Sequence, residues 1–205
     1  MEHTAIPKDE LEVFKSLENI RVVFDVGIRD DVDYLIIKPS IELHAFEPNP
    51  LFIEQLKVQI GNRKRIYINN YGLGDKFEEL PYDPVTQSFL LPVTNPKLPI
   101  KTLDWYVKKN NIKQIDFLKI DAEGYDYKIL LGGKKAIKIS RYIQFEWGAD
   151  YLQWFKPLLK DFDMDYIGGR NVICTRKGEK KPWIPEYPLE GGLIIKDESN
   201  RLRNI

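Results

Sequence analysis

Residues 115–126 constrain the fold of this chain more than any other stretch. Their sequence is Ile-Asp-Phe-Leu-Lys-Ile-Asp-Ala-Glu-Gly-Tyr-Asp, an apolar run that ends in two carboxylates and a glycine. An apolar run of this length, without strict alternation, is typical of a strand buried on both faces of a parallel sheet. Asp121 and Glu123 should therefore project at the carboxyl end of a central strand. In open α/β sheets that edge is where ligands bind.

The first third of the chain alternates predicted strands and helices. Its pattern predicts strands over residues 21–26, 42–47 and 65–70, and helices over residues 8–19, 30–38 and 51–60. Short connections between such elements favour a doubly wound parallel sheet. We therefore predict an α/β fold with a mostly parallel central sheet, helices on both faces and an antiparallel edge strand.

The rest of the chain continues this pattern after an interruption. Residues 77–99 contain five prolines, so we expect two edge strands or a folded loop there instead of a helix. Thr102 is the predicted N-cap of a helix over residues 103–109. Further helices are predicted over 125–131 and 151–160, and further strands over 141–147, 165–167 and 172–176. Residues 177–205 form a predicted C-terminal tail, rich in proline, that wraps the body or contacts a partner.

The composition suits an ordinary globular protein. The chain has 205 residues, of which 43% are hydrophobic, so we expect one domain over residues 1–205, with residues 1–19 as an N-terminal helical segment. Because 31 basic side chains balance 31 acidic ones, nothing suggests a nucleic-acid or anionic-membrane partner. A single cysteine, no secretion signal and no membrane-length apolar run together predict a cytoplasmic protein.

Two further strand ends carry residues that suit a ribose-containing ligand. Gly27 follows the first strand and allows close approach of a ligand, while Glu47 ends the second strand and could accept hydrogen bonds from both ribose hydroxyls. Asp30 and Asp31 would repel a dinucleotide pyrophosphate, so a ligand with a cationic centre and no phosphate fits better. S-adenosylmethionine (SAM) has this character. The alternative is that Asp25 and Glu47 merely cap helices.

Several motifs, in the order in which they occur along the chain, resemble those of the FkbM family of SAM-dependent methyltransferases. The Phe-Leu-Lys-Ile-Asp-x-Glu-Gly pattern is the most specific of them. Together they cover roughly residues 20–150. The motifs are Phe-Asp-Val-Gly at 24–27, Ala-Phe-Glu-Pro-Asn-Pro at 45–50, Gly-Leu-Gly-Asp at 72–75, Lys-Thr-Leu-Asp at 101–104, the stretch 115–125, and Ile-Gln-Phe-Glu at 143–146.

The resemblance implies a class I methyltransferase fold, which is Rossmann-like, and O-methylation of a hydroxyl, often on a sugar of a glycan or glycoconjugate. It also implies SAM as cofactor. The first loop departs from the family, because Asp30 stands where a second glycine is usual, so Arg29 and Asp30 either contact the cofactor differently or weaken its binding. The implied cofactor-binding residues are Asp25, Gly27, Ile28, Arg29, Asp30, Glu47, Pro48, Asn49, Gly72, Leu73, Asp121 and Ala122.

The resemblance places Asp121 and Glu123 at the point of methyl transfer, where a carboxylate could act as general base toward the hydroxyl. Glu146 could hold the sugar, or join Asp121 and Glu123 in a cluster that binds a divalent metal such as Mg²⁺. The alternative for Glu146 is a salt bridge to Arg141 or Lys119. Lys119 is a candidate catalytic residue, but an ion pair suits a lysine in a buried strand better.

Other reactive or aromatic residues have simpler interpretations. His44 lies within a predicted strand and suits a hydrogen-bonded core position, and Cys174 suits packing in another strand. Aromatic side chains near the active edge could stack on the face of a sugar. These are Tyr125, Trp147, Tyr151 and Trp154.

Two other classes of protein remain as alternatives. The missing second glycine would suit a non-catalytic cofactor- or glycan-binding module with the same fold. A nucleotide-sugar or dinucleotide enzyme is disfavoured by Asp30 and Asp31. We expect a sugar or glycan acceptor as partner, with residues 77–99 forming part of the acceptor wall. The chain could also be one domain of a larger glycan-building enzyme.

Overall fold

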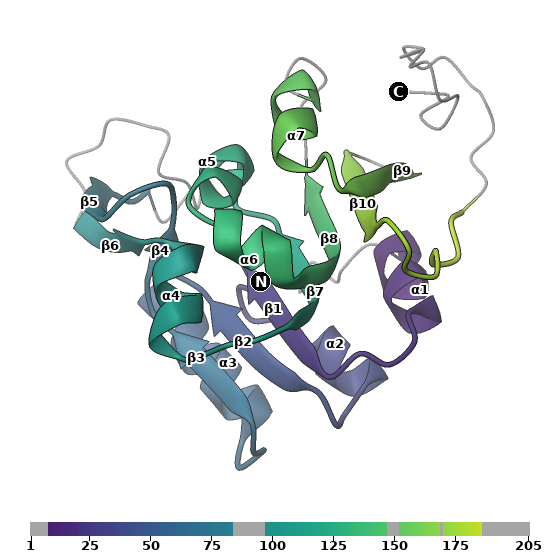
Figure 1. The fold of residues 1–205 in the computed structure, drawn as a ribbon. Coiled ribbons are helices and arrows are strands. Elements are labelled where there is room, and N and C mark those ends of the chain that lie inside the picture. Colours follow the sequence, from purple (N-terminus) through teal and green to yellow (C-terminus); the bar gives the residue numbers. More distant parts are fainter. Residues whose placement is uncertain (1–7, 84–96, 147–151, 169, 186–205) are drawn as a thin grey trace.

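The structure is a computed structural model that describes residues 8–83, 97–146, 152–168 and 170–185. Its centre is a seven-stranded sheet in the order β3-β2-β1-β7-β8-β10-β9 (Figure 1). The strands β1, β2, β3, β7 and β8 pair in parallel, as predicted. The bounds of the seven strands are β1 Val22–Val26, β2 Glu42–Phe46, β3 Ile66–Asn69, β7 Ile115–Ile120, β8 Ser140–Glu146, β9 Phe162–Gly168 and β10 Asn171–Arg176.

The strand predicted from residues 115–120 is β7, and it occupies the centre of the sheet. All six of its residues are buried, which confirms a strand covered on both faces. β10 runs antiparallel to both β8 and β9, so the reversed strand lies one place in from the edge. The fold class predicted from the sequence is confirmed.

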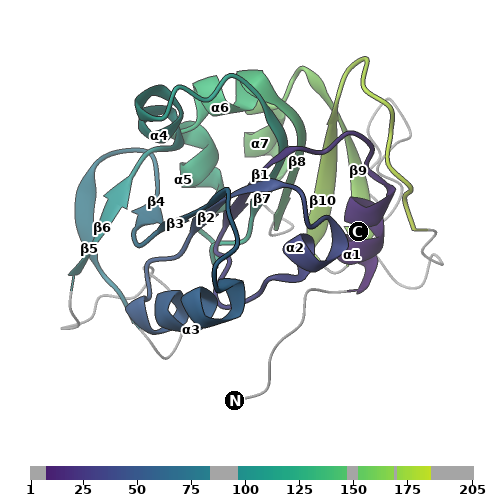
Figure 2. The same ribbon diagram turned by 90° about the horizontal axis from the view of Figure 1, so that it is seen from below.

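Helices cover both faces of this sheet, so the molecule has three layers (Figure 2). One apolar core joins one face of the sheet to α1 Lys8–Ser16, α2 Asp33–Ile37 and α3 Pro50–Ile60. A second core joins the other face to α4 Leu103–Lys109, α5 Asp126–Leu131, α6 Lys134–Ile139 and α7 Leu152–Leu158. No helix in the described part of the chain is long and apolar enough to cross a lipid bilayer.

The proline-rich interruption contributes to a second, smaller sheet. Here β4 Gly72–Leu73, β6 Lys97–Lys101 and β5 Glu78–Pro81 lie in the order β4-β6-β5. The predicted pair of strands is present as β5 and β6, which run antiparallel to each other. They do not extend an edge of the large sheet, because β6 pairs with β4 on its other side. Residues 84–96 lie outside the described part.

Helix α6 is absent from the sequence-based prediction, which ended the preceding helix at Gly132 and Gly133. Its first turn is capped by a distant residue: Asp104 Oδ1 accepts the backbone N–H groups of Lys135 and Ala136 at 2.7 and 3.0 Å. A cap supplied from about 30 residues away leaves no local sequence signal. By contrast, Thr102 caps α4 from within the local sequence, as predicted, by accepting the Trp105 N–H.

The first part of the predicted tail lies against the body. The Tyr142 hydroxyl donates to the carbonyl oxygen of Lys180 at 2.7 Å, and the Trp183 N–H donates to Ser16 Oγ at 2.9 Å. Lys181 Nζ lies 2.6 Å from a carboxylate oxygen of Asp165. Residues 177–185 therefore connect β8, β9 and α1, whereas residues 186–205 lie outside the described part.

Candidate active site

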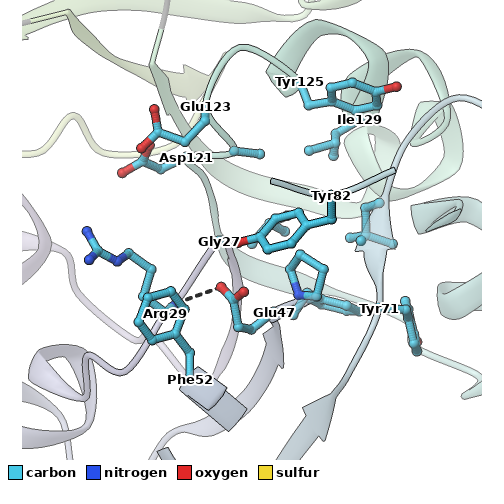
Figure 3. A pocket seen from close by; sticks show the side chains of 16 residues that line it. Gly27, Arg29, Glu47, Phe52, Tyr71, Tyr82, Asp121, Glu123, Tyr125 and Ile129 are labelled. Atoms are coloured by element: carbon cyan, nitrogen blue, oxygen red, sulfur yellow. Dashed lines mark hydrogen bonds between the residues drawn. The ribbon is translucent and has the colours of Figure 1, made fainter. Parts of the chain in front are cut away.

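A pocket opens at the carboxyl ends of β1, β2 and β7 and encloses about 670 Å³ of empty space, including its open mouth (Figure 3). Parallel strands bring their carboxyl ends to one edge, which is why residues distant in sequence meet here. The lining residues are Val26, Gly27, Arg29, Phe46, Glu47, Pro48, Phe52, Tyr71, Gly72, Leu73, Tyr82, Asp121, Ala122, Glu123, Tyr125 and Ile129.

The turn after β1 requires glycine for two reasons. Gly27 has φ of +81°, and a Cβ atom added there would lie 1.8 Å from the carbonyl oxygen of Asp121. Backbone hydrogen bonds hold the turn, because Gly27 N–H donates to Phe46 and Asp121 N–H donates to Val26. This glycine therefore lets the first loop lie directly against the end of β7.

Glu47 directly follows β2 and carries a carboxylate that is buried and already oriented. Its Oε2 accepts the Arg29 N–H at 3.1 Å, and its Oε1 accepts the Asn49 N–H at 2.7 Å. Burial raises the pKa of Glu47 to about 7, while these backbone hydrogen bonds oppose the rise. Asn49, and not Glu47, is the N-cap of α3, and Asp25 forms an ion pair with Lys119, which argues against the simpler interpretation that the two carboxylates cap helices. Hydroxyl donors from a ligand would stabilise the ionised form of Glu47.

The opposite side of the pocket carries Asp121 and Glu123, whose carboxylates lie side by side (Figure 3). Asp121 Oδ2 lies 3.4 Å from Lys119 Nζ. Glu123 has φ of +50° and precedes Gly124 with φ of +86°, so the chain turns sharply before α5. A left-handed conformation at a residue other than glycine is costly and is found preferentially at functional sites.

Lys119 is an ion-pair residue, as the sequence favoured. Its Nζ lies 3.7 Å from Asp25 Oδ1, and both side chains are buried. Burial alone would lower the pKa of Lys119, but Asp25 and Asp121 outweigh it and hold the pKa above its ordinary value. Burial raises the pKa of Asp25 to about 6, with Lys119 opposing the rise. Lys119 is therefore a charged partner of the carboxylates at neutral pH and no proton acceptor.

Glu146 forms a salt bridge, but with a residue that the sequence did not suggest. Its Oε1 lies 2.7 Å from the guanidinium of Arg170, in the connection between β9 and β10. Arg141 instead pairs with Asp116 and Glu179. The prediction of Arg141 or Lys119 as the partner of Glu146 is therefore wrong, because both basic side chains form ion pairs with other carboxylates.

Four predicted cofactor residues do not line the pocket. Asp25 lies beneath it in the ion pair with Lys119, and the Ile28 side chain is buried in the core. Asn49 Oδ1 accepts the Leu51 N–H as the N-cap of α3. The carbonyl of Asp30 accepts a hydrogen bond from the side chain of Gln59. Asp30 is not among the residues that line the pocket.

Several aromatic residues other than Tyr125 line the pocket and were not predicted from the sequence. Phe52 stacks under Arg29, whose guanidinium carbon lies 5.2 Å from the ring centroid. Tyr71 and Tyr82 lie near Glu47 (Figure 3), and burial raises the pKa of Tyr82 to about 12. Tyr82 belongs to the predicted insertion 77–99 and is the part of it that lines the pocket within the described residues. Tyr71 directly precedes Gly72, a predicted cofactor-binding residue, so the sequence did contain a weak signal that Tyr71 lies at the site.

Three carboxylates were candidates for a metal site. Within the described residues there is no group of three His, Cys, Asp or Glu side chains that could hold a metal ion. Asp121, Glu123 and Glu146 therefore do not form the predicted cluster. The salt bridge with Arg170 holds Glu146 separately.

The remaining single-residue predictions mostly concern the core. His44 is buried, with Nδ1 2.7 Å from the Tyr106 hydroxyl, and Cys174 is fully buried in β10, which confirms both as core residues. Tyr125 lines the pocket, and Trp154 is 46% exposed with its ring 5.7 Å from that of Tyr127. Trp147 and Tyr151 lie outside the described residues.

The strand order, the reversed β10 and the pocket at the carboxyl ends of β1, β2 and β7 define a class I methyltransferase fold. Solved structures share it. A methyltransferase FkbM from Methylobacillus flagellatus has a TM-score of 0.55 and 15% identity, covering 79% of this chain and 47% of that one. SMU.1697c from Streptococcus mutans, in complex with S-adenosylhomocysteine (SAH), has a TM-score of 0.53 and 10% identity, covering 82% and 94%.

The family is shown by the sequence itself. The sequence model of a family described as "Methyltransferase FkbM domain" matches residues 25–164. The chain therefore belongs to the FkbM methyltransferase family. The 2-O-methyltransferase NoeI from Sinorhizobium fredii is 19% identical over 177 residues, covering 71% of this chain and 73% of NoeI. The chain spans about half the length of the Methylobacillus structure. The predicted family is confirmed.

Proposed function

We propose that this chain transfers a methyl group from SAM to a hydroxyl, and that the acceptor is a sugar of a glycan or glycoconjugate. The observation that carries the proposal is the placement of two carboxylates, Glu47 and Asp121, on opposite sides of one pocket. One can hold a ribose and the other can take a proton. The name of NoeI, a 2-O-methyltransferase, supports an oxygen acceptor.

The residues fit the cofactor in two respects. The Glu47 carboxylate is buried, oriented by two backbone N–H groups, and still able to accept further hydrogen bonds from ribose hydroxyls. Gly72, Leu73 and Tyr71 line the pocket beyond β3 and would contact the adenine. The Gly27 turn would face the methionine portion. SAM supplies an electrophilic methyl group on a sulfonium and leaves as the neutral thioether SAH.

Asp121 is the proposed general base. As the new C–O bond forms and the S–CH₃ bond breaks, the hydroxyl proton would pass to a carboxylate oxygen of Asp121. Lys119 Nζ, 3.4 Å from Asp121 Oδ2, would hold this carboxylate in place, so Lys119 is a positioning residue. Glu123 lies beside Asp121 and would orient the acceptor hydroxyl. Glu146, held by Arg170, would bind a more distant part of the acceptor.

An assay with isotopically methyl-labelled SAM and a panel of oligosaccharides tests this function. We expect label to enter one class of oligosaccharide as a methyl ether, and expect the Asp121→Asn variant to lose this activity while it still binds SAH. Label in a nitrogen or carbon position would overturn the O-methylation proposal. Binding of an oligosaccharide without any methyl transfer would favour the non-catalytic glycan-binding module.

A further inference from the structure

Helix α1 contributes one buried carboxylate to the underside of the site. Glu10 is 3% exposed, and its two oxygens accept hydrogen bonds from Gln144 Nε2 at 2.6 Å and Asn171 Nδ2 at 2.7 Å. Both Glu10 and Asn171 lie outside residues 25–164, the span that matches the family. Contacts this short between a buried carboxylate and two amides fix the first turn of α1 against β8 and β10.

Glu10 meets a polar row that crosses the centre of the sheet. Asp25, Lys119 and Gln144 are register partners on the adjacent strands β1, β7 and β8. Adjacent strands lie about 4.8 Å apart, so these three side chains are direct neighbours on one face. Asp121 follows Lys119 by two residues and lines the pocket. The row therefore connects the carboxylate under α1 to the pocket itself.

Carboxylates outnumber cations in this cluster. Lys119 Nζ lies 3.7 Å from Asp25 and 3.4 Å from Asp121, and it also interacts electrostatically with Glu10. One ammonium thus faces three carboxylates. Burial raises the pKa of Glu10 to about 7, with Lys119 opposing the rise and Asp121 and Asp25 adding to it. Above this pH the cluster carries a surplus of negative charge.

Arg29 brings a second cation to the pocket, but among the described lining residues Glu47 and Glu123 add two more carboxylates, so acidic groups still outnumber basic ones. The buried Tyr34 hydroxyl of α2 has no hydrogen-bond partner among the described residues, and its pKa is raised by burial and then by Asp25 and Glu10. Asp31 adds further negative charge beside Asp25. The groups that face Glu10 from β8 and β10 are the neutral amides of Gln144 and Asn171.

We infer that Glu10 is a specificity residue of the cofactor site: with Asp25 and Asp121 it gives this side of the pocket more carboxylates than Lys119 neutralises, and so favours the cationic cofactor over its neutral thioether product. The inference rests on the proposed function, because it takes SAM and SAH as the two ligands. They differ by one positive charge and one methyl group. A charge difference is felt strongly where burial limits screening by water. The surplus would therefore help retain SAM and release SAH.

Calorimetric titration of SAM and SAH at pH 8 tests this inference without any acceptor. The readout is the ratio of the two dissociation constants. In the Glu10→Gln variant we expect the preference for SAM over SAH to fall about fivefold relative to the wild type. Glu12→Gln is the matched control, because Glu12 lies on the same helix in an exposed pair with Lys15, and it should leave the ratio unchanged.

A double variant that moves the carboxylate to the neighbouring position distinguishes an effect of charge from an effect of altered structure. Glu10→Gln combined with Gln144→Glu returns a carboxylate to the same hydrogen bond, so it should restore the preference for SAM. Glu10→Gln should fold, because the raised pKa means that the ionised form of Glu10 is disfavoured in the folded protein. In the wild type the preference should also weaken from pH 8 to pH 6, as Glu10 and Asp25 take up protons.

Each outcome bears on the inference. An unchanged SAM-to-SAH ratio in folded Glu10→Gln would overturn it, and so would a loss of preference that the double variant fails to restore. If neither variant folds, a wild-type ratio that is flat between pH 8 and pH 6 overturns it instead. Failure of the cofactor assignment, on which the inference rests, is distinct, because the wild type would then bind neither SAM nor SAH.

Discussion

Gly27 and Asp121 touch backbone to backbone: a Cβ atom at Gly27 would lie 1.8 Å from the Asp121 carbonyl oxygen. The two residues directly follow the neighbouring strands β1 and β7, and each borders the pocket. The cofactor loop and the proposed general base are therefore positioned by the same contact. A change at the loop should disturb both sides of the site.

The Gly27→Ala variant should lower the free energy of unfolding by about 3 kcal/mol, because a left-handed φ and a backbone clash add together. It should also weaken SAH binding. Gly178→Ala is the matched control, since Gly178 has φ of +96° but nothing within 4 Å of an added Cβ, and it should cost only about 1 kcal/mol. Equal costs for the two variants, measured by urea unfolding, would contradict the contact.

The Glu47→Gln variant should bind SAH about 10- to 100-fold more weakly, because an amide offers one acceptor oxygen where the carboxylate offers two. In the wild type, binding should weaken as the pH falls below about 7, the raised pKa of Glu47. Ligand hydroxyls bind the ionised form, so protonation competes with binding. Calorimetry across pH 5.5–8.5 measures this, with the exposed Glu54→Gln as control. The same pH dependence in Glu47→Gln would argue for another titrating group.

The Asp121→Asn variant should lower kcat at least about 100-fold, because the amide cannot take the proton, while SAH affinity should stay within about threefold of wild type, because SAH lacks the sulfonium charge that the carboxylate attracts. Glu123→Gln should instead raise the KM for the acceptor more than it lowers kcat. Steady-state kinetics on the oligosaccharide found in the label assay distinguish the two. If alanine at both positions leaves turnover unchanged while SAH still binds, this site is wrong.

The Lys119→Met variant should destabilise the protein by about 3–5 kcal/mol at pH 8, because the buried Asp25 must then either stay ionised without its cation or take up a proton at a pH where the unfolded chain is ionised. The loss should shrink at pH 5. With Lys119 present the pKa of Asp25 is about 6, and without it the carboxyl would protonate still more readily. A second change, Asp25→Asn, should recover much of the loss. Lys57→Met, which breaks an exposed pair, should cost less than about 1 kcal/mol. Equal losses at pH 5 and pH 8 would contradict this account.

The sequence predicted those helices and strands that are determined by residues close to each other in the chain. The apolar run of β7 and the Thr102 cap of α4 both depend on residues within a few positions of each other. Because ligands bind at the carboxyl ends of parallel strands, the sequence also pointed to Glu47 and Asp121 as site residues, and both line the pocket. Asn49 was assigned to the cofactor, although an asparagine directly before a proline was also an N-cap signal.

Contacts between distant residues were the part that sequence could not supply. Asp104 caps α6, Arg170 pairs with Glu146, and Glu10 meets Gln144 across 134 positions. None of these pairs has a spacing that identifies it. Tyr82 was missed for the same reason, because it directly follows β5 and the pairing of β5 with β6 sets where it lies.

Titration of SAH into the wild-type protein and into Glu47→Gln tests the central claim most directly. The account predicts a single site of micromolar affinity in the wild type and at least about tenfold weaker binding in the variant. It would be contradicted by no binding to the wild type at millimolar SAH. Equal binding to both proteins would show that SAH occupies some place other than this pocket.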